Sequence, residues 1–440
     1  MNNWRPFQLR DLADKSKENS FTDGDWIEAP YIEAEGIRLI QTGNVGIGEF
    51  LDSNKKYISS KTFRVLSCKE VVPGDVLICR LADPIGRACI VPPECSTSIT
   101  SVDVTIFRID EERFEKRYVV YSINTDDFLG RCIEKSGGTT RQRISRSNLG
   151  SLELFLPDLP LQRKIALILT TIDNLIEKTE ALIEKYQSIK QGMMHDLFTR
   201  GVTENGELRP PYEEAPHLYK RSELGWIPKE WEVKTIGSMT ARVGSGITPT
   251  GGSEVYLTEG IIFIRSQNVT LGGLDLSDVA FINERTHVQM AASEVFPFDV
   301  LLNITGASIG RCCYVPADIG RANTNQHVCC IRLVVPNEPD AKFLSSILSS
   351  PIGQNQIFRL NAGGNREGLN YQQLRSFRVP WTNEDERKAI AIRLDSIDKT
   401  TLAEQAFHLK LLQQKQGLMQ DLLTGKVPVK VEKMEEAANV

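Results

Sequence analysis

One stretch of about forty residues contains no helix breaker, and it constrains the fold more than any other. Residues 159–201 read LPLQRKIALILTTIDNLIEKTEALIEKYQSIKQGMMHDLFTRG, with Gly192 as the one interior glycine. Apolar residues recur at spacings of three and four, broken at Thr179, which is typical of a coiled coil. Such a helix, about 60 Å long at ~1.5 Å per residue, needs a partner helix. The apolar positions are Ile165, Ile168, Ile172, Leu175, Leu182, Tyr186, Ile189 and Met193.

The chain supplies this partner through an internal repeat. Residues 190–199 read KQGMMHDLFT and residues 415–424 read KQGLMQDLLT, at an offset of 225. IGRACIVP at 85–92 likewise matches IGRCCYVP at 309–316, at an offset of 224. Because one register holds over half the chain, the sequence indicates a duplicated unit. We expect its halves to be related by an approximate two-fold axis, with the two long helices antiparallel.

The repeat predicts an α+β fold: two similar, strand-rich regions of mixed α/β structure separated by two long antiparallel coiled-coil helices. Runs of β-branched residues at 75–80 and 102–109 predict strands in the first region. A Pro- and Glu-rich segment without periodicity predicts a linker. In chain order, the expected parts are a globular region at 1–158, a helix at 159–201 with Gly201 as its cap, a linker at 202–222, a globular region at 223–381, a helix at 382–424 and a tail at 425–440.

Composition and charge narrow the class of protein. The chain has 52 basic and 57 acidic residues, a net charge of −5. This disfavours nucleic-acid binding only mildly, because binding depends on where the basic residues lie. It also fits a protein that shares DNA with more basic partner subunits. The sequence lacks an apolar run long enough for a membrane helix and shows no signal peptide, and its nine scattered cysteines are typical of a reducing compartment. We therefore expect a cytoplasmic protein.

Motifs of catalysis are missing from the sequence. It contains no P-loop, G-x-S-x-G or H-E-x-x-H motif, and no G-x-G-x-x-G motif after a strand. RPPYEE, which begins at Arg209, resembles the (N/D)PP(Y/F) motif of amino-methyltransferases only superficially, so we expect a proline turn. The remaining candidate for a chemical site is a group of cysteines, a residue type that binds zinc. These cysteines lack C-x-x-C spacing, so we expect buried thiols rather than a zinc site. These cysteines are Cys312, Cys313, Cys329 and Cys330.

Polar loops at matched positions of the two halves are the candidate binding residues. Arg, Asn, Gln, Ser and Thr side chains pair with bases and phosphates, and neighbouring glycines permit close approach of a ligand. The alternative interpretation of the loops is that they are merely solvated. For the arginines of the IGR repeat, the alternative is that they form structural ion pairs. The candidates are Thr42, Asn44, Arg87, Thr139, Thr140, Arg141 and Arg143 in the first half, and Arg265, Ser266, Asn268, Arg311, Asn325, Gln326, Asn365 and Arg366 in the second.

Four segments resemble the DNA-specificity (S) subunit of type I restriction–modification systems. They are KQGMMHDLFTRG at 190–201, KQGLMQDLLTGK at 415–426, LYKRSELGWIPKEWEV at 218–233 and LPLQRKIALILTTID at 159–173. The last is similar to the start of the family's first central helix. The resemblance extends over nearly the whole chain.

The resemblance implies a non-catalytic protein whose two target-recognition domains each read one part of a bipartite, asymmetric DNA site. The helices would act as a ruler for the unread gap and would dock two modification (methyltransferase) subunits, joined by restriction (translocase-nuclease) subunits. It further implies that double-stranded DNA is a partner, that no membrane is involved and that this chain binds no cofactor or metal. S-adenosylmethionine, which supplies the methyl group for adenine N6, would be bound by the modification subunit, and ATP and Mg would also belong to partner subunits.

Two other classes of function remain open from the sequence. A coiled-coil scaffold with two protein-binding heads predicts no salt-dependent affinity for DNA, whereas a DNA reader predicts an affinity that falls steeply with log[salt]. A methyltransferase in its own right predicts methyl transfer by the purified chain alone. The missing cofactor loop argues against this last class.

Overall fold

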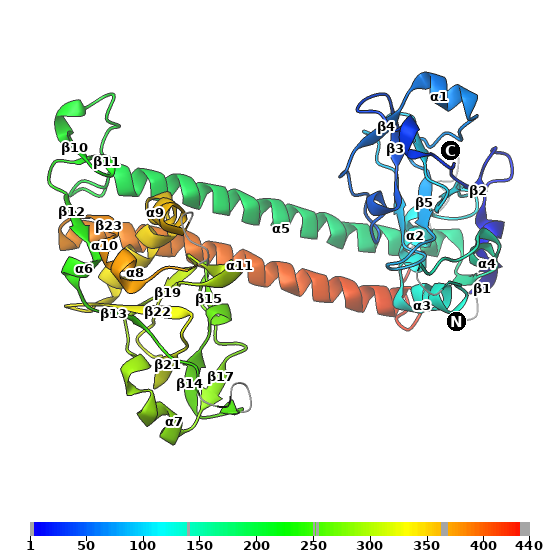
Figure 1. Cartoon of the computed structure of the whole chain (residues 1–440). Helices are drawn as coiled ribbons and strands as arrows, with labels where there is room; N and C mark the ends of the chain where they lie inside the picture. Colours follow the sequence, from blue (N-terminus) through cyan, green and yellow to red (C-terminus); the bar gives the residue numbers. More distant parts are fainter. Residues whose placement is uncertain (1–3, 139–140, 250, 252–254, 362–367, 432–440) are drawn as a thin grey trace, which may run out of the picture. The chain divides into compact units, whose positions relative to one another are not determined.

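The computed structural model describes residues 4–138, 141–249, 251, 255–361 and 368–431. The chain divides into two compact units (Figure 1). Unit 1 comprises Met1–Lys178 and Leu409–Val440, and unit 2 comprises Thr179–His408. Each unit contains one four-stranded sheet and a second sheet of three or four strands, together with short helices. The predicted fold of two similar mixed α/β regions is therefore confirmed.

In unit 1, the larger sheet has the antiparallel strand order β2-β8-β5-β6 and the smaller sheet the order β4-β3-β7. The predicted strands are confirmed as β5 and β8, whose consecutive apolar residues are all buried. The elements are β1 (Arg5–Gln8), β2 (Phe21–Asp23), β3 (Ile37–Ile40), β4 (Lys56–Ile58), α1 (Ser60–Val65), β5 (Val76–Cys79), β6 (Ala88–Ile90), β7 (Ser98–Thr100), β8 (Val104–Phe107), α2 (Lys116–Ile123), α3 (Asp126–Glu134), α4 (Arg146–Gly150) and β9 (Glu153–Leu156).

In unit 2, the two main sheets have the strand orders β13-β22-β19-β20 and β17-β14-β21-β18. The elements are β10 (Tyr219–Ser222), β11 (Gly225–Pro228), β12 (Glu232–Thr235), α6 (Ile236–Met239), β13 (Thr240–Ser245), β14 (Ile261–Ile264), β15 (Val269–Thr270), β16 (Gly273–Leu274), β17 (Ala280–Ile282), α7 (Glu284–Gln289), β18 (Glu294–Val295), β19 (Val300–Asn303), β20 (Cys312–Tyr314), β21 (Ala322–Thr324), β22 (Val328–Leu333), α8 (Glu338–Ser349), α9 (Pro351–Asn361), α10 (Tyr371–Ser376) and β23 (Arg378–Trp381).

Five strands of unit 1 have counterparts in unit 2 at the offset of the sequence repeat. β3, β5, β6, β7 and β8 each begin 224 residues before β14, β19, β20, β21 and β22, respectively. The pairing is repeated as well, since β3 is parallel to β7 and β14 is parallel to β21. The sequence repeat is therefore a repeat of structure.

The recurrent DVL motif contributes the same buried ion pair to each unit. Arg108 Nε lies 3.0 Å from Asp75 Oδ1 in unit 1, and Arg332 Nη2 lies 2.7 Å from Asp299 Oδ2 in unit 2. Each carboxylate also accepts a hydrogen bond from a backbone N–H three residues earlier, at 3.0 Å and 2.8 Å. A buried charge is tolerated only when it is paired in this way, which accounts for the repetition of the motif.

The two long helices are α5 (Leu159–Thr199) and α11 (Glu384–Leu422), within two residues of the predicted ends. Gly201 follows α5 in the left-handed conformation, at φ +64°, as expected of a C-cap glycine. In unit 1 the start of α5 packs against the end of α11, with Ile165 and Leu422 in one apolar cluster. In unit 2 the end of α5 packs against the start of α11, with Leu197 and Ile390 in another. The helices are therefore antiparallel in each unit.

The predicted apolar stripe on α5 is only partly buried. Ile165 and Ile172 of this stripe are buried, but Leu175 and Ile189 are 43% and 40% exposed. The buried residues still alternate at spacings of four and three, through Ile165, Leu169, Ile172 and Ile176. Ile172 and Ile176 pack with Leu411 of α11 in one apolar cluster. The predicted spacing is therefore present, but it lies on a neighbouring face of the helix.

The segment at 202–222, which the sequence identifies only as a linker, is built onto unit 2. β10 begins inside it and pairs with β11. The ring of Tyr212 stacks on Trp226, with 4.1 Å between ring centroids. The predicted proline turn is present, since the N–H of Ala215 donates to the carbonyl of Pro211. Arg209 forms an ion pair with the buried Glu386. Among the described residues, the helices are too short or too polar to cross a membrane.

Candidate nucleic-acid interface

In unit 1, Arg87 gathers two of the loops that carry predicted site residues. Its Nε donates to the carbonyl of Val45 at 2.6 Å and its Nη2 to the carbonyl of Thr42 at 2.8 Å. Its Nη1 donates to the carbonyls of Leu81 and Pro84, at 3.2 and 2.9 Å. Arg87 therefore has a structural role, as the alternative interpretation held. Its partners are backbone carbonyls, however, and not the carboxylate of an ion pair. Arg87 holds the loops that present Thr42, and it is itself buried.

Asn44 and Asn268 shape the same turn in the two units. The amide of Asn44 donates to the carbonyls of Leu51 and Ser53, both at 2.8 Å, and its Oδ1 accepts from the N–H of Gln41. Asn268 repeats the arrangement with the carbonyls of Asp275 and Asp278 and the N–H of Arg265. Both asparagines are buried. Their donors are occupied, so they position neighbouring residues rather than facing a ligand.

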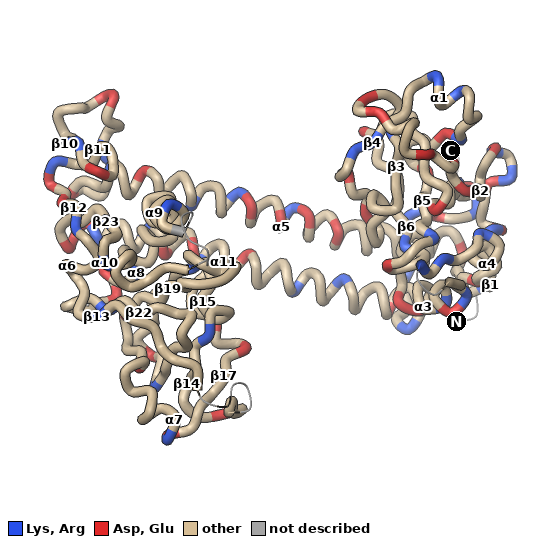
Figure 2. Tube along the Cα trace, in the orientation of Figure 1, with Lys and Arg blue, Asp and Glu red and all other residues tan. Residues whose placement is uncertain are grey.

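The basic loop at 136–148 joins this site through Arg143. Arg143 forms an isolated β-bridge with Leu81, and its Nε lies 2.7 Å from Asp103 Oδ1. The neighbouring Arg141 is exposed. The structure therefore brings Thr42, Arg87 and Arg143 together, and Arg141 lies two residues before Arg143. Thr139 and Thr140 lie outside the described residues. Figure 2 shows basic residues gathered beside α4.

Three further charged residues of this cluster were missed by sequence reasoning. Arg80 is buried at the end of β5, and its Nη2 lies 3.0 Å from Asp23 Oδ2. Asp23 also lies 4.0 Å from Nη1 of Arg146, and Asp103 pairs with Arg143 as described. Of these, only Arg80 carries a sequence signal, because it ends an otherwise apolar strand. The aspartates stand in unrelated segments and are recognisable only from the fold.

In unit 2, predicted and unpredicted residues line a hollow of about 460 Å³. Ser266 and Arg311 were predicted, and among the described residues the Arg311 guanidinium has no ion pair. Gln326 borders the hollow, since its Nε2 lies 3.1 Å from Nε2 of His327. The predicted Asn325 is buried and accepts from the N–H of His327 at 3.0 Å. The full lining is Ser266, Gln267, Thr305, Gly306, Ala307, Ser308, Arg311 and His327.

The remaining predicted residues of unit 2 lie beside the hollow or beyond the described part. Arg265 is half-buried, and its guanidinium lies over the ring of Tyr256, 5.7 Å from the centroid, and donates to the carbonyl of Asp278. Asn365 and Arg366 lie outside the described residues. Gly368, two residues after Arg366 in the sequence, forms a β-bridge with Thr305 of the hollow. His327, Gln267, Thr305 and Ser308 were missed, although all but Thr305 stand within three residues of a predicted position.

The cysteines of unit 2 are buried thiols, as predicted. Cys312 and Cys313 lie opposite Leu302 and Leu301 of β19, so neighbouring thiols face opposite sides of the sheet. Burial raises the pKa of Cys313 and Cys329 to about 12. Among the described residues there is no group of three or more His, Cys, Asp or Glu side chains placed to hold a metal ion.

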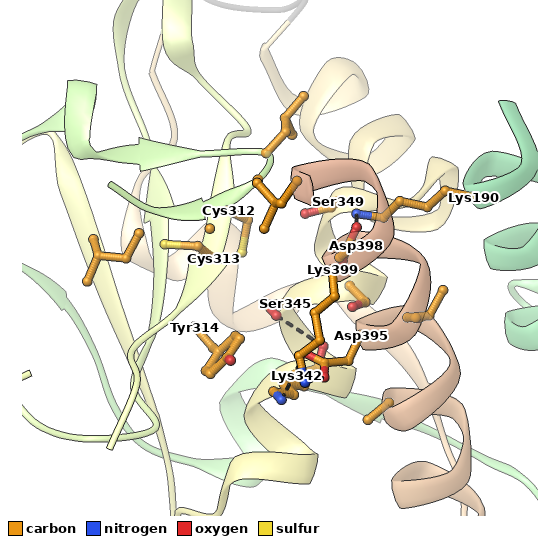
Figure 3. Close-up of a pocket in the computed structure, with 18 of the residues that line it drawn as sticks. Lys190, Cys312, Cys313, Tyr314, Lys342, Ser345, Ser349, Asp395, Asp398 and Lys399 are labelled. Carbon is orange, nitrogen blue, oxygen red and sulfur yellow. Dashed lines mark hydrogen bonds and ion pairs between the residues drawn. The ribbon is translucent and has the colours of Figure 1, made fainter. Parts of the chain in front are cut away.

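The recurrent KQG motif has its place at the helix pair. Lys190 of α5 and Asp398 of α11 face each other in unit 2 (Figure 3), with Nζ 2.5 Å from Oδ1. Close by, Lys342 of α8 pairs with Asp395 of α11 at 3.0 Å. In unit 1, Lys415 of the second KQG motif lies 2.8 Å from Asp173. The arrangement ties helices together and has no catalytic geometry.

Two repeated α/β units, each presenting a cluster of polar loops and each joined to paired helices, define a duplicated recognition protein. The sequence model of the type I restriction modification DNA specificity domain matches residues 1–186 and 228–411. The chain therefore belongs to this family. It is a type I restriction–modification specificity subunit, a non-catalytic protein that recognises DNA, and its family assembles with methyltransferase and restriction subunits.

Individual relatives agree with this assignment. The chain is 26% identical over 366 residues to the putative type I restriction enzyme MjaX specificity subunit of Methanocaldococcus jannaschii, covering 82% of this chain and 80% of the relative. It is 26% identical over 301 residues to the EcoBI specificity subunit of Escherichia coli, covering 66% and 60%. The crystal structure of the S subunit from M. genitalium has the same fold, with a TM-score of 0.59, 16% identity and 97% of each chain covered.

Proposed function

We propose that each unit reads one half of a bipartite, asymmetric DNA site through its own loop cluster. Unit 1 reads with the loops around Thr42, Arg141 and Arg143, and unit 2 with the hollow around Ser266 and Arg311. One observation carries this proposal: the loops are held by the same scaffold in both units, through Asn44 and Asn268, but expose different side chains. Different donors and acceptors select different bases, so the half-sites differ.

The helices provide matched surfaces for two copies of one partner, which we take to be the modification subunit. Leu167 on α5 and Ile392 on α11 are 61% and 60% exposed and stand 225 residues apart. Each has an exposed basic residue four positions earlier, Arg163 or Lys388, and an exposed hydroxyl residue four positions later. Residues at this spacing share one helix face. An exposed apolar residue framed by polar ones suits a protein interface.

The chemistry of the complex belongs to these partners under the proposal. The modification subunits bind S-adenosylmethionine and methylate adenine N6, and the restriction subunits use ATP and Mg. This chain binds no cofactor itself and works in the cytoplasm, on the DNA present there. Its contribution is the choice of site and the assembly of the complex.

Methylome sequencing tests the reading of DNA. Host DNA is sequenced by a single-molecule method with the chain and its modification subunit present, and again with the chain deleted. We expect a bipartite adenine-methylated motif that disappears on deletion. Exchange of residues 1–157 for the corresponding region of a relative is expected to change one half-site and leave the other. An unchanged methylome in a strain that expresses the methyltransferase would refute the proposal.

Native mass spectrometry tests the docking of two modification subunits. We expect the complex of the unaltered chain to hold two, and Leu167→Asp or Ile392→Asp each to reduce this number to one. Glu177→Gln, an exposed change on α5, is the matched control and should retain both. Retention of two subunits by the Leu167→Asp, Ile392→Asp double variant would place the interface elsewhere.

A further inference from the structure

The two loop clusters differ in charge at five structurally equivalent positions. The equivalence follows from shared contacts: Arg143 bridges Leu81 as Gly368 bridges Thr305, and β2 pairs with β8 in the register in which β13 pairs with β22. Charged residues of unit 1 are replaced at these positions by residues without a fixed charge in unit 2. Asp23, Arg80, Asp103, Arg143 and Arg146 of unit 1 correspond to Ser245, Ile304, His327, Gly368 and Tyr371 of unit 2.

In unit 1 these residues form two groups of ion pairs. Asp23 lies between Arg80, at 3.0 Å, and Arg146, at 4.0 Å, and Asp103 lies 2.7 Å from Arg143. The Arg80 side chain is buried and its Nε has no hydrogen-bond partner. Arg143 and Arg146 keep 43% and 45% of their side-chain surface exposed. Their pairs with the aspartates fix the two guanidinium groups and leave further N–H donors facing solvent.

The charges of this cluster do not balance. Among the described residues, Arg80, Arg143 and Arg146 pair with two carboxylates, those of Asp23 and Asp103. Fixed, partly exposed guanidinium groups with excess positive charge match the geometry of phosphate oxygens.

In unit 2 the equivalent contacts are neutral hydrogen bonds. The Tyr371 hydroxyl lies 2.5 Å from Oγ of Ser245, in the place of the Arg146–Asp23 pair. Oγ1 of Thr305 lies 2.6 Å from Nδ1 of His327, which stands in the place of Asp103. Such groups carry donors and acceptors suited to base edges but little attraction for a polyanion.

We infer that the Arg143–Arg146 cluster of unit 1 is a DNA phosphate-binding site that has no ionic counterpart at the equivalent described positions of unit 2. Unit 1 thus binds DNA electrostatically at positions where unit 2 presents neutral groups, and in unit 2 the positive charge among the described lining residues of the hollow is that of Arg311. The inference rests on the proposed function and specifies which component of DNA each unit contacts. It also explains how an acidic chain binds DNA, because the positive charge is local.

The test is the salt dependence of binding by the full complex with its modification subunits to a duplex that carries the methylated motif. Each phosphate contact contributes about 0.9 to the slope of log K against log[salt]. For the double variant Arg143→Gln, Arg146→Gln we expect a slope shallower by about 1 to 2. The double variant Arg143→Lys, Arg146→Lys should retain most of the wild-type slope, because both positive charges are kept. The matched control in unit 2, Ser245→Ala with Tyr371→Phe, should leave the slope unchanged.

Three results separate the possibilities. A slope unchanged by the glutamine variant, with thermal unfolding showing a folded complex, would overturn the inference. A changed methylated motif in that variant would also overturn it, because phosphate contacts carry no sequence information, and would identify these arginines as base-reading. Failure of the unaltered complex to bind the duplex at any salt concentration would overturn the proposed function and this inference together.

Discussion

Lys190 Nζ lies 2.5 Å from Asp398 Oδ1, and this ion pair has an internal copy in which Lys415 lies 2.8 Å from Asp173. The two lysines stand 225 residues apart, and so do the two aspartates. Each lysine opens a KQG motif near the end of one long helix, and each aspartate lies near the start of the other. The repetition of the motif therefore follows from the antiparallel pairing of the helices.

Charge reversal of this pair should show how much it contributes. The side chains of Lys190 and Asp398 are 23% and 36% exposed, so solvent weakens their attraction. We expect Lys190→Asp to lower the free energy of unfolding by about 1 kcal/mol and the added Asp398→Lys to recover most of that loss. Urea unfolding of the wild type, both single variants and the double variant measures this. If the loss of stability in the double variant equals the sum of the losses in the two single variants, the ion pair does not couple the helices.

Truncation of Glu386 should destabilise unit 2 strongly. Its buried carboxylate accepts from Nε1 of Trp231 at 2.9 Å and from the N–H of Val202 at 2.8 Å, and it pairs with Arg209. Glu386→Ala leaves these donors unpaired, which typically costs about 3 to 5 kcal/mol. Chemical unfolding checks this, with the exposed Glu384→Ala as control. Equal stability of the two variants would contradict the role given to Glu386.

The stability that Asp395 contributes should depend on acid pH. Burial tends to raise the pKa of this carboxyl, but its bonds to Lys399 and Lys342 outweigh this and lower the pKa below 3.8. The contribution is then fully present above about pH 4 and is lost as pH falls through the lowered pKa. We expect Asp395→Asn to be less stable than wild type by a constant amount at pH 5 to 7, and by less below pH 3.8. Asp318→Asn, at an exposed turn, is the control variant. A stability difference between Asp395→Asn and wild type that widens in acid would refute the prediction.

Alkylation should distinguish Cys95 from the other thiols. Cys95 is half-buried, whereas the remaining eight cysteines are buried. Burial raises the pKa of Cys89 and Cys132 to about 12, which leaves little reactive thiolate. With iodoacetamide at pH 8, peptide mass spectrometry should find Cys95 modified first, and all nine cysteines modified in urea. Early modification of Cys312 or Cys313 would mean that their sheet opens readily.

Insertions in the helices should change the spacing of the half-sites only when they are matched. In unit 2, Glu180 contacts His408 and Lys190 contacts Asp398, so the segment 180–190 of α5 runs antiparallel to the segment 398–408 of α11. Seven residues inserted into each of these two segments keep the helices in register and lengthen the pair by about 10 Å. This length corresponds to roughly three base pairs at 3.4 Å each. We expect methylome sequencing to show a wider gap and unchanged bases. Seven residues inserted into α5 alone should lower the stability of the protein. A change in the recognised bases after the matched insertion would refute the hypothesis that the helices set the length of the gap.

Much of the architecture was predictable because it depends on local pattern and on repetition. The long helices, the strands β5 and β8 and the C-cap at Gly201 follow from hydrophobic periodicity, glycine and chain punctuation. The duplication follows from one constant offset. These features need no knowledge of which distant segments meet.

The burial of α5 and the roles of single polar residues were decided by tertiary structure. Leu175 and Ile189 fit the apolar stripe but are exposed, whereas Ile176, beside Leu175, packs on Leu411 of α11. Arg87 and Arg311 stand in the same IGR repeat. Arg87 is buried among carbonyls that come from as many as 45 residues away, whereas Arg311 faces a hollow.

The sequence by itself therefore determined that this protein is a duplicated chain of two α/β regions on paired helices, because periodicity and repetition are written along the chain. Only the tertiary structure decided which arginines support the loops and which line the hollow. A side chain's partners depend on segments that are distant in sequence, as Asp23 and Asp103 are from Arg146 and Arg143. The tertiary structure also shows which residues of the two units occupy equivalent positions, and therefore where the charges of the units differ.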